Sequence, residues 1–145
     1  MRRILICALL FPMYLSISIG DPKPISTDHL EKQAKLYRQE IEYERFAKAV
    51  SWVESRWNPQ AVGHSMDYGL FQITPIRLRD YNRRTGNNYT MQDMFNPVIN
   101  RMIFDYYSKG LPFEVAARRW NRAYEWRDTL GEKYWVLVKN KLNNL

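Results

Sequence analysis

Apolar side chains recur at helical spacing along most of the chain, and few stretches alternate as a half-buried strand would. Two helical stripes precede residue 58, and their phases differ, which predicts either a bend or two successive helices. Asp28, followed three residues later by Glu31, is expected to cap the first of them. The first stripe is Leu30, Ala34, Tyr37 and Ile41, and the second is Phe46, Ala49, Val50, Val53 and Trp57.

Proline, glycine and asparagine divide the rest of the chain into shorter elements. Asn58-Pro59 is expected to end the second helix, because the residue before proline is pushed out of the helical region. Residues 59–75 have the composition of an irregular loop or a short β-hairpin. Helices are predicted at 76–84, from Pro97 to Gly110, from Pro112 and around Tyr134, with a turn at 83–89. The helix from Pro97 is expected to pack through Val98, Met102, Ile103, Tyr106 and Tyr107.

The first twenty residues read as a separate targeting unit. Two arginines precede an apolar run from Ile4 to Leu15, and Ser18-Ile19-Gly20 resembles a cleavage site. The run is shorter than a membrane-spanning helix requires, so residues 1–20 are expected to be a signal peptide, with an uncleaved anchor as the alternative. The protein is then expected to be exported to the periplasm or the extracellular space, and to be membrane-associated if the N-terminal segment is not cleaved. Residues 21–41 are interpreted as a linker and N-terminal helix, and 42–145 as one mainly α domain.

Composition narrows the range of partners and cofactors. The sole cysteine, Cys7, lies in the targeting segment, so neither disulfides nor thiol chemistry is expected in the mature chain. A formal net charge of +7 suits a polyanionic partner such as a bacterial cell wall, and no nucleic-acid-binding signature accompanies it. With only His29 and His64 available, no metal site is expected. Five Trp and ten Tyr exceed what a small core needs, so some are expected to line a sugar-binding groove.

Glu54 is the candidate catalytic group. It lies at the end of an apolar helix, where burial and the negative end of the helix dipole should both raise the pKa of its carboxyl group. A glutamate that is protonated near neutral pH can act as a general acid on a glycosidic oxygen. On spacing alone, a surface glutamate on the polar face of the helix is the better interpretation.

The surrounding motifs favour the catalytic interpretation. Residues 54–62 read Glu-Ser-Arg-Trp-Asn-Pro-Gln-Ala-Val, and residues 68–75 read Tyr-Gly-Leu-Phe-Gln-Ile-Thr-Pro. In sequence and spacing, they resemble the first two motifs of the soluble lytic transglycosylase family. Residues 96–100, Asn-Pro-Val-Ile-Asn, are similar to its third motif, and residues 116–121, Ala-Ala-Arg-Arg-Trp-Asn, to its fourth. The resemblance spans residues 43–138.

This resemblance implies a lysozyme-like domain that cleaves the β-1,4 bond between N-acetylmuramic acid and N-acetylglucosamine. Glu54 would protonate the leaving oxygen and then accept the proton of the muramoyl 6-hydroxyl, which closes a 1,6-anhydro ring without any cofactor. By the same match, Gln72 would hydrogen-bond the sugar, Ser55 and Asn100 would support the site, and Asn121 would face the cleft.

The chain departs from the family pattern close to the candidate site. Gly63 stands where the family usually has Ser, which leaves Ser65 or His64 as replacements. Trp120 replaces a Tyr whose hydroxyl reaches towards the catalytic glutamate, and an indole can only donate a hydrogen bond. Tyr124 is the candidate for restoring that hydroxyl. Trp120, Tyr124 and Trp126 share one helical face, where either core packing or sugar stacking fits.

Asp67 opens a second mechanistic possibility. Asp67-Tyr68-Gly69-Leu70-Phe71-Gln72-Ile73 is similar to a segment of the c-type lysozymes, in which the matching Asp is the second carboxylate. Gly63-His64 with Asp67 also fits transglycosylases of secretion and conjugation machines, so a secretion, conjugation, pilus or phage-injection machine is a candidate partner. Tyr68 is a further candidate for contacting the substrate. Asp67 as a turn cap, and a non-catalytic wall-binding or assembly module, are the remaining alternatives.

Overall fold

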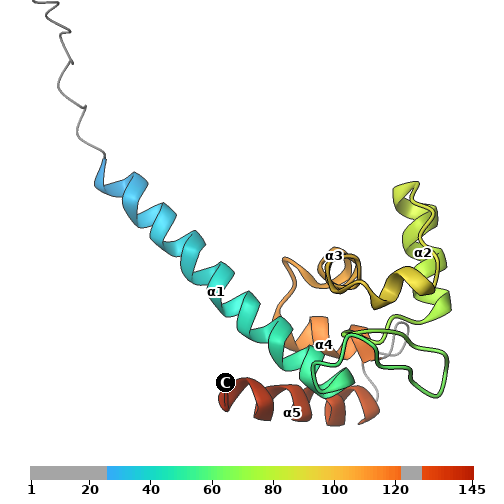
Figure 1. Cartoon of the computed structure of the whole chain (residues 1–145). Helices are drawn as coiled ribbons and strands as arrows, with labels where there is room; N and C mark the ends of the chain where they lie inside the picture. The colour runs from blue at the N-terminus through green and yellow to red at the C-terminus, as the bar shows by residue number, and fades with distance from the viewer. Residues whose placement is uncertain (1–25, 122–128) are drawn as a thin grey trace, which may run out of the picture.

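The computed structural model describes residues 26–121 and 129–145, and for Thr129 and Leu130 the backbone only. These residues form a helical assembly around the C-terminal half of one long helix (Figure 1). The prediction of a mainly α fold is confirmed. The elements are α1 (Thr27–Ser55), α2 (Pro75–Thr85), the 3-10 helix η1 (Gln92–Phe95), α3 (Pro97–Ser108), α4 (Phe113–Asn121) and α5 (Thr129–Asn143).

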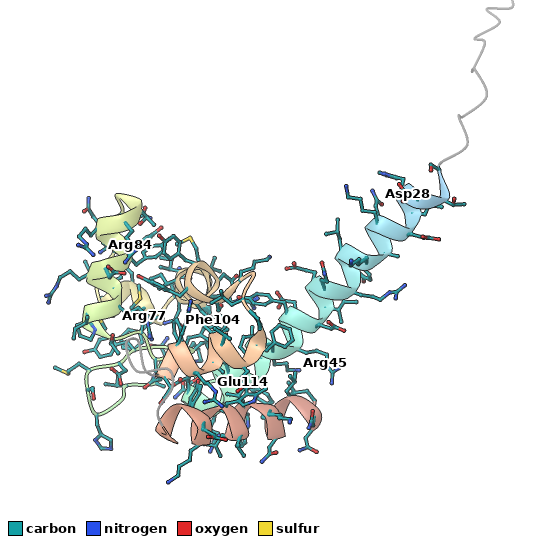
Figure 2. The ribbon with its side chains drawn as sticks, turned by 180° about the vertical axis from the view of Figure 1, so that it is seen from behind. Asp28, Arg45, Arg77, Arg84, Phe104 and Glu114 are labelled. Carbon is teal, nitrogen blue, oxygen red and sulfur yellow. The ribbon has the colours of Figure 1, made fainter. Side chains whose placement is uncertain are left out.

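Helix α1 is continuous, so the predicted bend or break between its two stripes is wrong. Residues 26–42 are exposed and project away from the rest of the fold, with Asp28 near the tip (Figure 2). The phase of the apolar stripe changes because the helix meets the core only from Tyr43 onward. The predicted cap is also wrong: the helix begins at Thr27, and Asp28 lies inside its first turn.

The C-terminal end of α1 is set by backbone geometry rather than by proline. Arg56 and Trp57 have φ values of 56° and 64°, in the left-handed region. Their N–H groups donate to Trp52 O and Ser51 O at 3.0 and 3.4 Å, which is the pattern that commonly closes a helix. The helix therefore ends at Ser55, ahead of Asn58-Pro59, which had been expected to end it.

The core is a set of aromatic rings from α1, α3, α4 and the loop before α2. Phe46 stacks on Phe113 with ring centroids 4.6 Å apart. Phe104 stacks on Phe71 at 4.2 Å and meets Trp120 edge-on at 4.9 Å. Helix α5 packs against both α1 and α4 and brings the C-terminal end of the chain back to α1 (Figure 1).

Helix α3 presents a more polar face to the core than was predicted. Asn96 caps it, and Pro97 occupies its first turn, as expected. The predicted apolar side is largely wrong, because Val98, Met102 and Tyr106 are exposed. The buried face is Asn100, Ile103, Phe104 and Ser108. Ser108 and Asn100 can be buried on this face because each has a hydrogen-bond partner in another segment: the Tyr43 hydroxyl for Ser108 and the Phe71 N–H for Asn100.

The loop predicted after α1 is present, with two isolated bridges in place of a hairpin. Tyr68 and Ile73 exchange backbone hydrogen bonds of 3.1 and 3.0 Å, and Val62 also pairs with Tyr68. Within the described ranges, no helix has the length and apolar character needed to cross a membrane.

Gly69 is required by this loop, and its substitution should destabilise the protein. Its φ is +80°, and a Cβ atom there would lie 2.1 Å from Met94 O and 2.4 Å from Asn100 Nδ2. Gly86 has a similar φ of +76° but open space around it. We expect Gly86→Ala to cost about 1 kcal/mol in the free energy of unfolding and Gly69→Ala at least about 2 kcal/mol more. Equal losses in urea titrations of the two variants would contradict this packing.

Candidate active site

The loop over residues 61–73 is fastened to the end of α1 and to α3. Ser55 Oγ lies 2.9 Å from Leu70 O and 3.0 Å from Ser51 O, so this hydroxyl joins the loop to the helix. Asn100 is fully buried, and its Oδ1 accepts from Phe71 N at 2.8 Å. Its Nδ2 donates to Tyr68 O and Met94 O at 2.9 and 2.8 Å. Both side chains therefore support the geometry of the site, as the family resemblance implies.

Glu54 occupies the last turn of α1, where α5 covers it. Tyr134 Oη, on α5, donates a 2.5 Å hydrogen bond to Glu54 Oε1. Within the described part of the chain, Oε2 has no hydrogen-bond partner and is the oxygen left to carry a transferable proton. The Tyr134 hydroxyl thus fixes one oxygen of this carboxyl group.

The pKa of Glu54 is raised from 4.5 to about 7. Burial is the main cause, because desolvation disfavours the charged form of a carboxyl group. The hydrogen bond from Tyr134 and the nearby charge of Arg77 lower the pKa in part, and Asp67 raises it further. Glu54 is therefore an acid that holds or gives up its proton near neutral pH, as its sequence position suggested.

Arg77 and Asp67 supply the charges around Glu54. Arg77 lies near the start of α2, on the side facing α4 (Figure 2), and its Nη2 donates to Trp120 O at 2.8 Å. Asp67 comes from the loop, and its Oδ1 is buried without a hydrogen-bond partner among the described residues. Burial raises the pKa of Asp67, and the charge of Arg77 opposes that rise. Among the described residues, no hydrogen bond to the Asp67 side chain supports its interpretation as a turn cap.

Gln72 is held in a strained backbone conformation beside Asp67. Its φ is 50°, and its Nε2 lies 2.9 Å from Gly69 O and 3.3 Å from Ala61 O. The loop thus orients this amide. Gly63 completes the arrangement, because a Cβ there would lie 2.6 Å from Gln72 Oε1 and 3.2 Å from Asp67 Oδ2. A serine at this position would therefore displace the Gln72 and Asp67 side chains.

The two aromatic candidates have structural contacts of their own. Trp120 is only 4% exposed, and its Nε1 donates to Phe71 O at 3.1 Å. Of the two alternatives for Trp120, core packing describes its position in the structure, and the indole also lines the edge of a pocket. Tyr68 is half-buried and stacks on Phe95, with ring centroids 4.9 Å apart.

The remaining candidates lie at the edge of the site or outside the described residues. Asn121 is exposed at the end of α4, and His64 is exposed in the loop. Tyr124 and Trp126 fall outside the described residues. Across residues 26–121 and 129–145, no three His, Cys, Asp or Glu side chains gather as a metal site would require.

Two residues of the site were missed by sequence reasoning. Tyr134, which had been placed on the last helix as an apolar residue, supplies a hydroxyl to Glu54 from a position eighty residues away. Arg77, which acts electrostatically on Glu54, was not among the candidates. The absence of a tyrosine at position 120 was a signal that another hydroxyl was needed, but nothing local distinguishes Tyr134 from the chain's other tyrosines.

This fold and site define a class of protein: a lysozyme-like helical domain in which a buried glutamate, Glu54, has its pKa raised to about 7. The Transglycosylase SLT domain family matches residues 32–107, which is more than half of the chain, and the chain belongs to this family. The SLT domain is a lysozyme-like all-α fold of lytic transglycosylase type, and the family implies peptidoglycan as the substrate. No curated protein and no solved structure matches the chain.

The raised pKa of Glu54 should make stability depend on pH. The folded protein holds this proton up to about pH 7, whereas the unfolded chain releases it near 4.5. The contribution of this proton to the free energy of unfolding is fully present below pH 4.5. It falls by at most about 3 kcal/mol as the pH rises to about 7. Glu54→Gln should therefore be more stable than wild type at about pH 8 and no more stable at about pH 4.

Thermal and urea unfolding across that range would measure the difference. Glu132→Gln is a matched control, because it removes an exposed carboxylate of α5. A stability gain of Glu54→Gln that is the same at every pH would contradict the raised pKa.

Tyr134→Phe should raise the pKa of Glu54 further above 7, because the lost hydrogen bond favours the carboxylate form. The infrared carbonyl band of the protonated acid, identified by difference against Glu54→Gln, would follow the titration. Tyr37→Phe removes an exposed hydroxyl of α1 and serves as the control. An unchanged or lowered midpoint in Tyr134→Phe would show that Tyr134 does not act on this carboxyl group.

Proposed function

We propose that the protein is a peptidoglycan lytic transglycosylase that cleaves the β-1,4 bond between N-acetylmuramic acid and N-acetylglucosamine. The observation that carries the proposal is the Glu54 carboxyl group, whose pKa of about 7 leaves a proton to donate at neutral pH. Family membership supports the substrate class. The loop that holds Gln72 beside Asp67 supports a site shaped to receive a glycan.

In the first step, Glu54 Oε2 transfers its proton to the glycosidic oxygen as the bond from that oxygen to the anomeric carbon breaks. N-acetylglucosamine leaves with a new hydroxyl, and positive charge develops at the muramoyl ring. Tyr134 keeps its hydrogen bond to Glu54 Oε1 and so stabilises the carboxylate that results. Arg77 adds a positive charge that favours the same ionised state.

In the second step, the Glu54 carboxylate accepts the proton of the muramoyl 6-hydroxyl while that oxygen attacks the anomeric carbon. The product is a 1,6-anhydro ring, Glu54 regains its proton, and no water is consumed. Asp67, with one oxygen buried and unpartnered in the described structure, is placed to stabilise the positive charge between the steps. Gln72 would orient the sugar through its amide group.

A hydrolase of lysozyme type is the second candidate, and the same feature of Asp67 favours it. A second carboxylate that acts on the electron-deficient anomeric carbon would let water complete the reaction in place of the 6-hydroxyl. A non-catalytic wall-binding or assembly module was suggested by the changes at Gly63 and Trp120. The contact between Tyr134 and Glu54 weakens that argument, because it provides the hydroxyl that Trp120 cannot.

We also propose that the protein is exported and acts in the periplasm or outside the cell. The support is the N-terminal sequence pattern and the basic composition, which suits an anionic wall. A secretion, conjugation, pilus or phage-injection machine is the proposed partner. The sequence similarity around Gly63, His64 and Asp67 is the support for that partner.

Digestion of purified peptidoglycan in H₂¹⁸O, followed by mass spectrometry, tests the proposal. We expect 1,6-anhydromuramic ends without ¹⁸O, a loss of about 10²–10⁴-fold in rate for Glu54→Gln, and a slower reaction with unchanged product for Asp67→Asn. Reducing muramic ends that carry ¹⁸O would identify a hydrolase instead. No cleavage by the wild type, or full activity of Glu54→Gln, would overturn the proposal.

A further inference from the structure

A pocket of about 240 Å³ lies beside the catalytic loop, between α2, α3 and α4. It begins at Thr74, two residues after Gln72, and continues along Arg77 and Trp120. Arg77 acts electrostatically on both Glu54 and Asp67, so the pocket adjoins the candidate active site. The remaining lining is Ile76, Asp80, Arg84, Tyr107, Ala116 and Arg119.

Arginines dominate the charge of this pocket. The one carboxylate among its described lining residues, Asp80, is already engaged by Arg83 and Arg84 at 2.7 Å each and by Tyr107 Oη at 2.8 Å. Asp80 therefore pairs with residues of α2 and α3 and not with Arg77 or Arg119, the other two arginines of the pocket.

Arg77 and Arg119 retain donors that the described residues do not use. The guanidinium of Arg77 lies 3.9 Å from the centre of the Trp120 ring, and one of its nitrogens binds Trp120 O. Stacking fixes the plane of the group and leaves its other N–H groups at the edge. Arg119 is exposed on α4 and makes no ion pair or hydrogen bond within the described ranges. The two guanidinium groups therefore line the same pocket without a carboxylate partner among those residues.

This arrangement suits a carboxylate better than a neutral sugar. A guanidinium presents paired N–H donors that match the two oxygens of a carboxylate, and it stays charged at every physiological pH. Neutral glycans are bound mainly by aromatic faces and amides. The lining has two aromatic residues among those described, and Arg77 lies over the rings of both, 3.9 Å from the Trp120 ring centre and 5.9 Å from that of Tyr107. The lining thus selects for an anionic substituent carried by the glycan.

We propose that Arg119, with Arg77, binds a carboxylate of the acidic peptide stem that branches from N-acetylmuramic acid, and so makes the enzyme prefer stem-bearing glycan. This inference rests on the proposed function for the identity of the glycan. The pocket adjoins the loop where the muramoyl residue would bind, so the stem would enter it directly. Arg119 is then a specificity-determining residue rather than a catalytic one.

The test compares stem-bearing muropeptide chains with the same chains after amidase removal of the stems, both stripped of wall phosphates with hydrofluoric acid. We expect wild type to have a lower KM for stem-bearing chains at similar kcat. Arg119→Gln should raise that KM about three- to tenfold and leave the KM for stripped chains unchanged. Arg79→Gln is the matched control, because Arg79 is an exposed arginine of α2 outside the pocket.

Binding to the Glu54→Gln protein separates this inference from the proposed catalytic function. Calorimetry should show weaker binding of stem-bearing chains when Arg119→Gln is added to that protein, and no change when Arg79→Gln is added. An equal affinity of the Arg119→Gln protein and its parent for stem-bearing chains would overturn the inference even if cleavage is confirmed. If Arg119→Gln weakened the binding of stripped chains as much as that of stem-bearing chains, the inference would also be overturned, because the arginine would then contact the glycan itself.

Discussion

The hydrogen bonds of the fully buried Asn100 are the constraint on which the site depends. One amide group from α3 binds the backbone of Tyr68, Phe71 and Met94 at the same time, and so fixes both the loop over residues 61–73 and η1. The loop has two isolated bridges and no sheet to hold it, so buried side chains must supply this rigidity. Gly69 permits the close approach, and Ser55 fastens the same loop to α1.

The chemistry follows from placing Glu54 against this loop and beneath α5. Burial holds the carboxyl group in its neutral form, while Tyr134 and Arg77 favour the charged form in part. These opposing effects leave the pKa of Glu54 at about 7, where donating and recovering a proton are both feasible. A carboxyl group buried without Tyr134 and Arg77 would hold its proton too tightly, and an exposed one would already have lost it.

Local patterns were enough to predict the parts of the structure that local chemistry determines. The helix start at Pro97, the loop after α1 and the place of Glu54 in the last turn of α1 all depend on neighbouring residues. The errors concern contacts between distant segments. The continuity of α1 and the buried face of α3 depend on what packs beside them. Tyr134 reaches Glu54 only through the packing of α5 on α1, a pairing that no local sequence pattern encodes.

The central claim is that Glu54 carries a proton at neutral pH, and direct titration of its side-chain carboxyl group tests it most closely. Carbon-13 NMR of glutamate-labelled wild-type protein, with the Glu54 resonance identified by its absence in Glu54→Gln, would follow this one group. The account predicts a midpoint of about 7. A midpoint near the ordinary glutamate value of 4.5 would contradict it, because Glu54 would then be ionised before any substrate arrived.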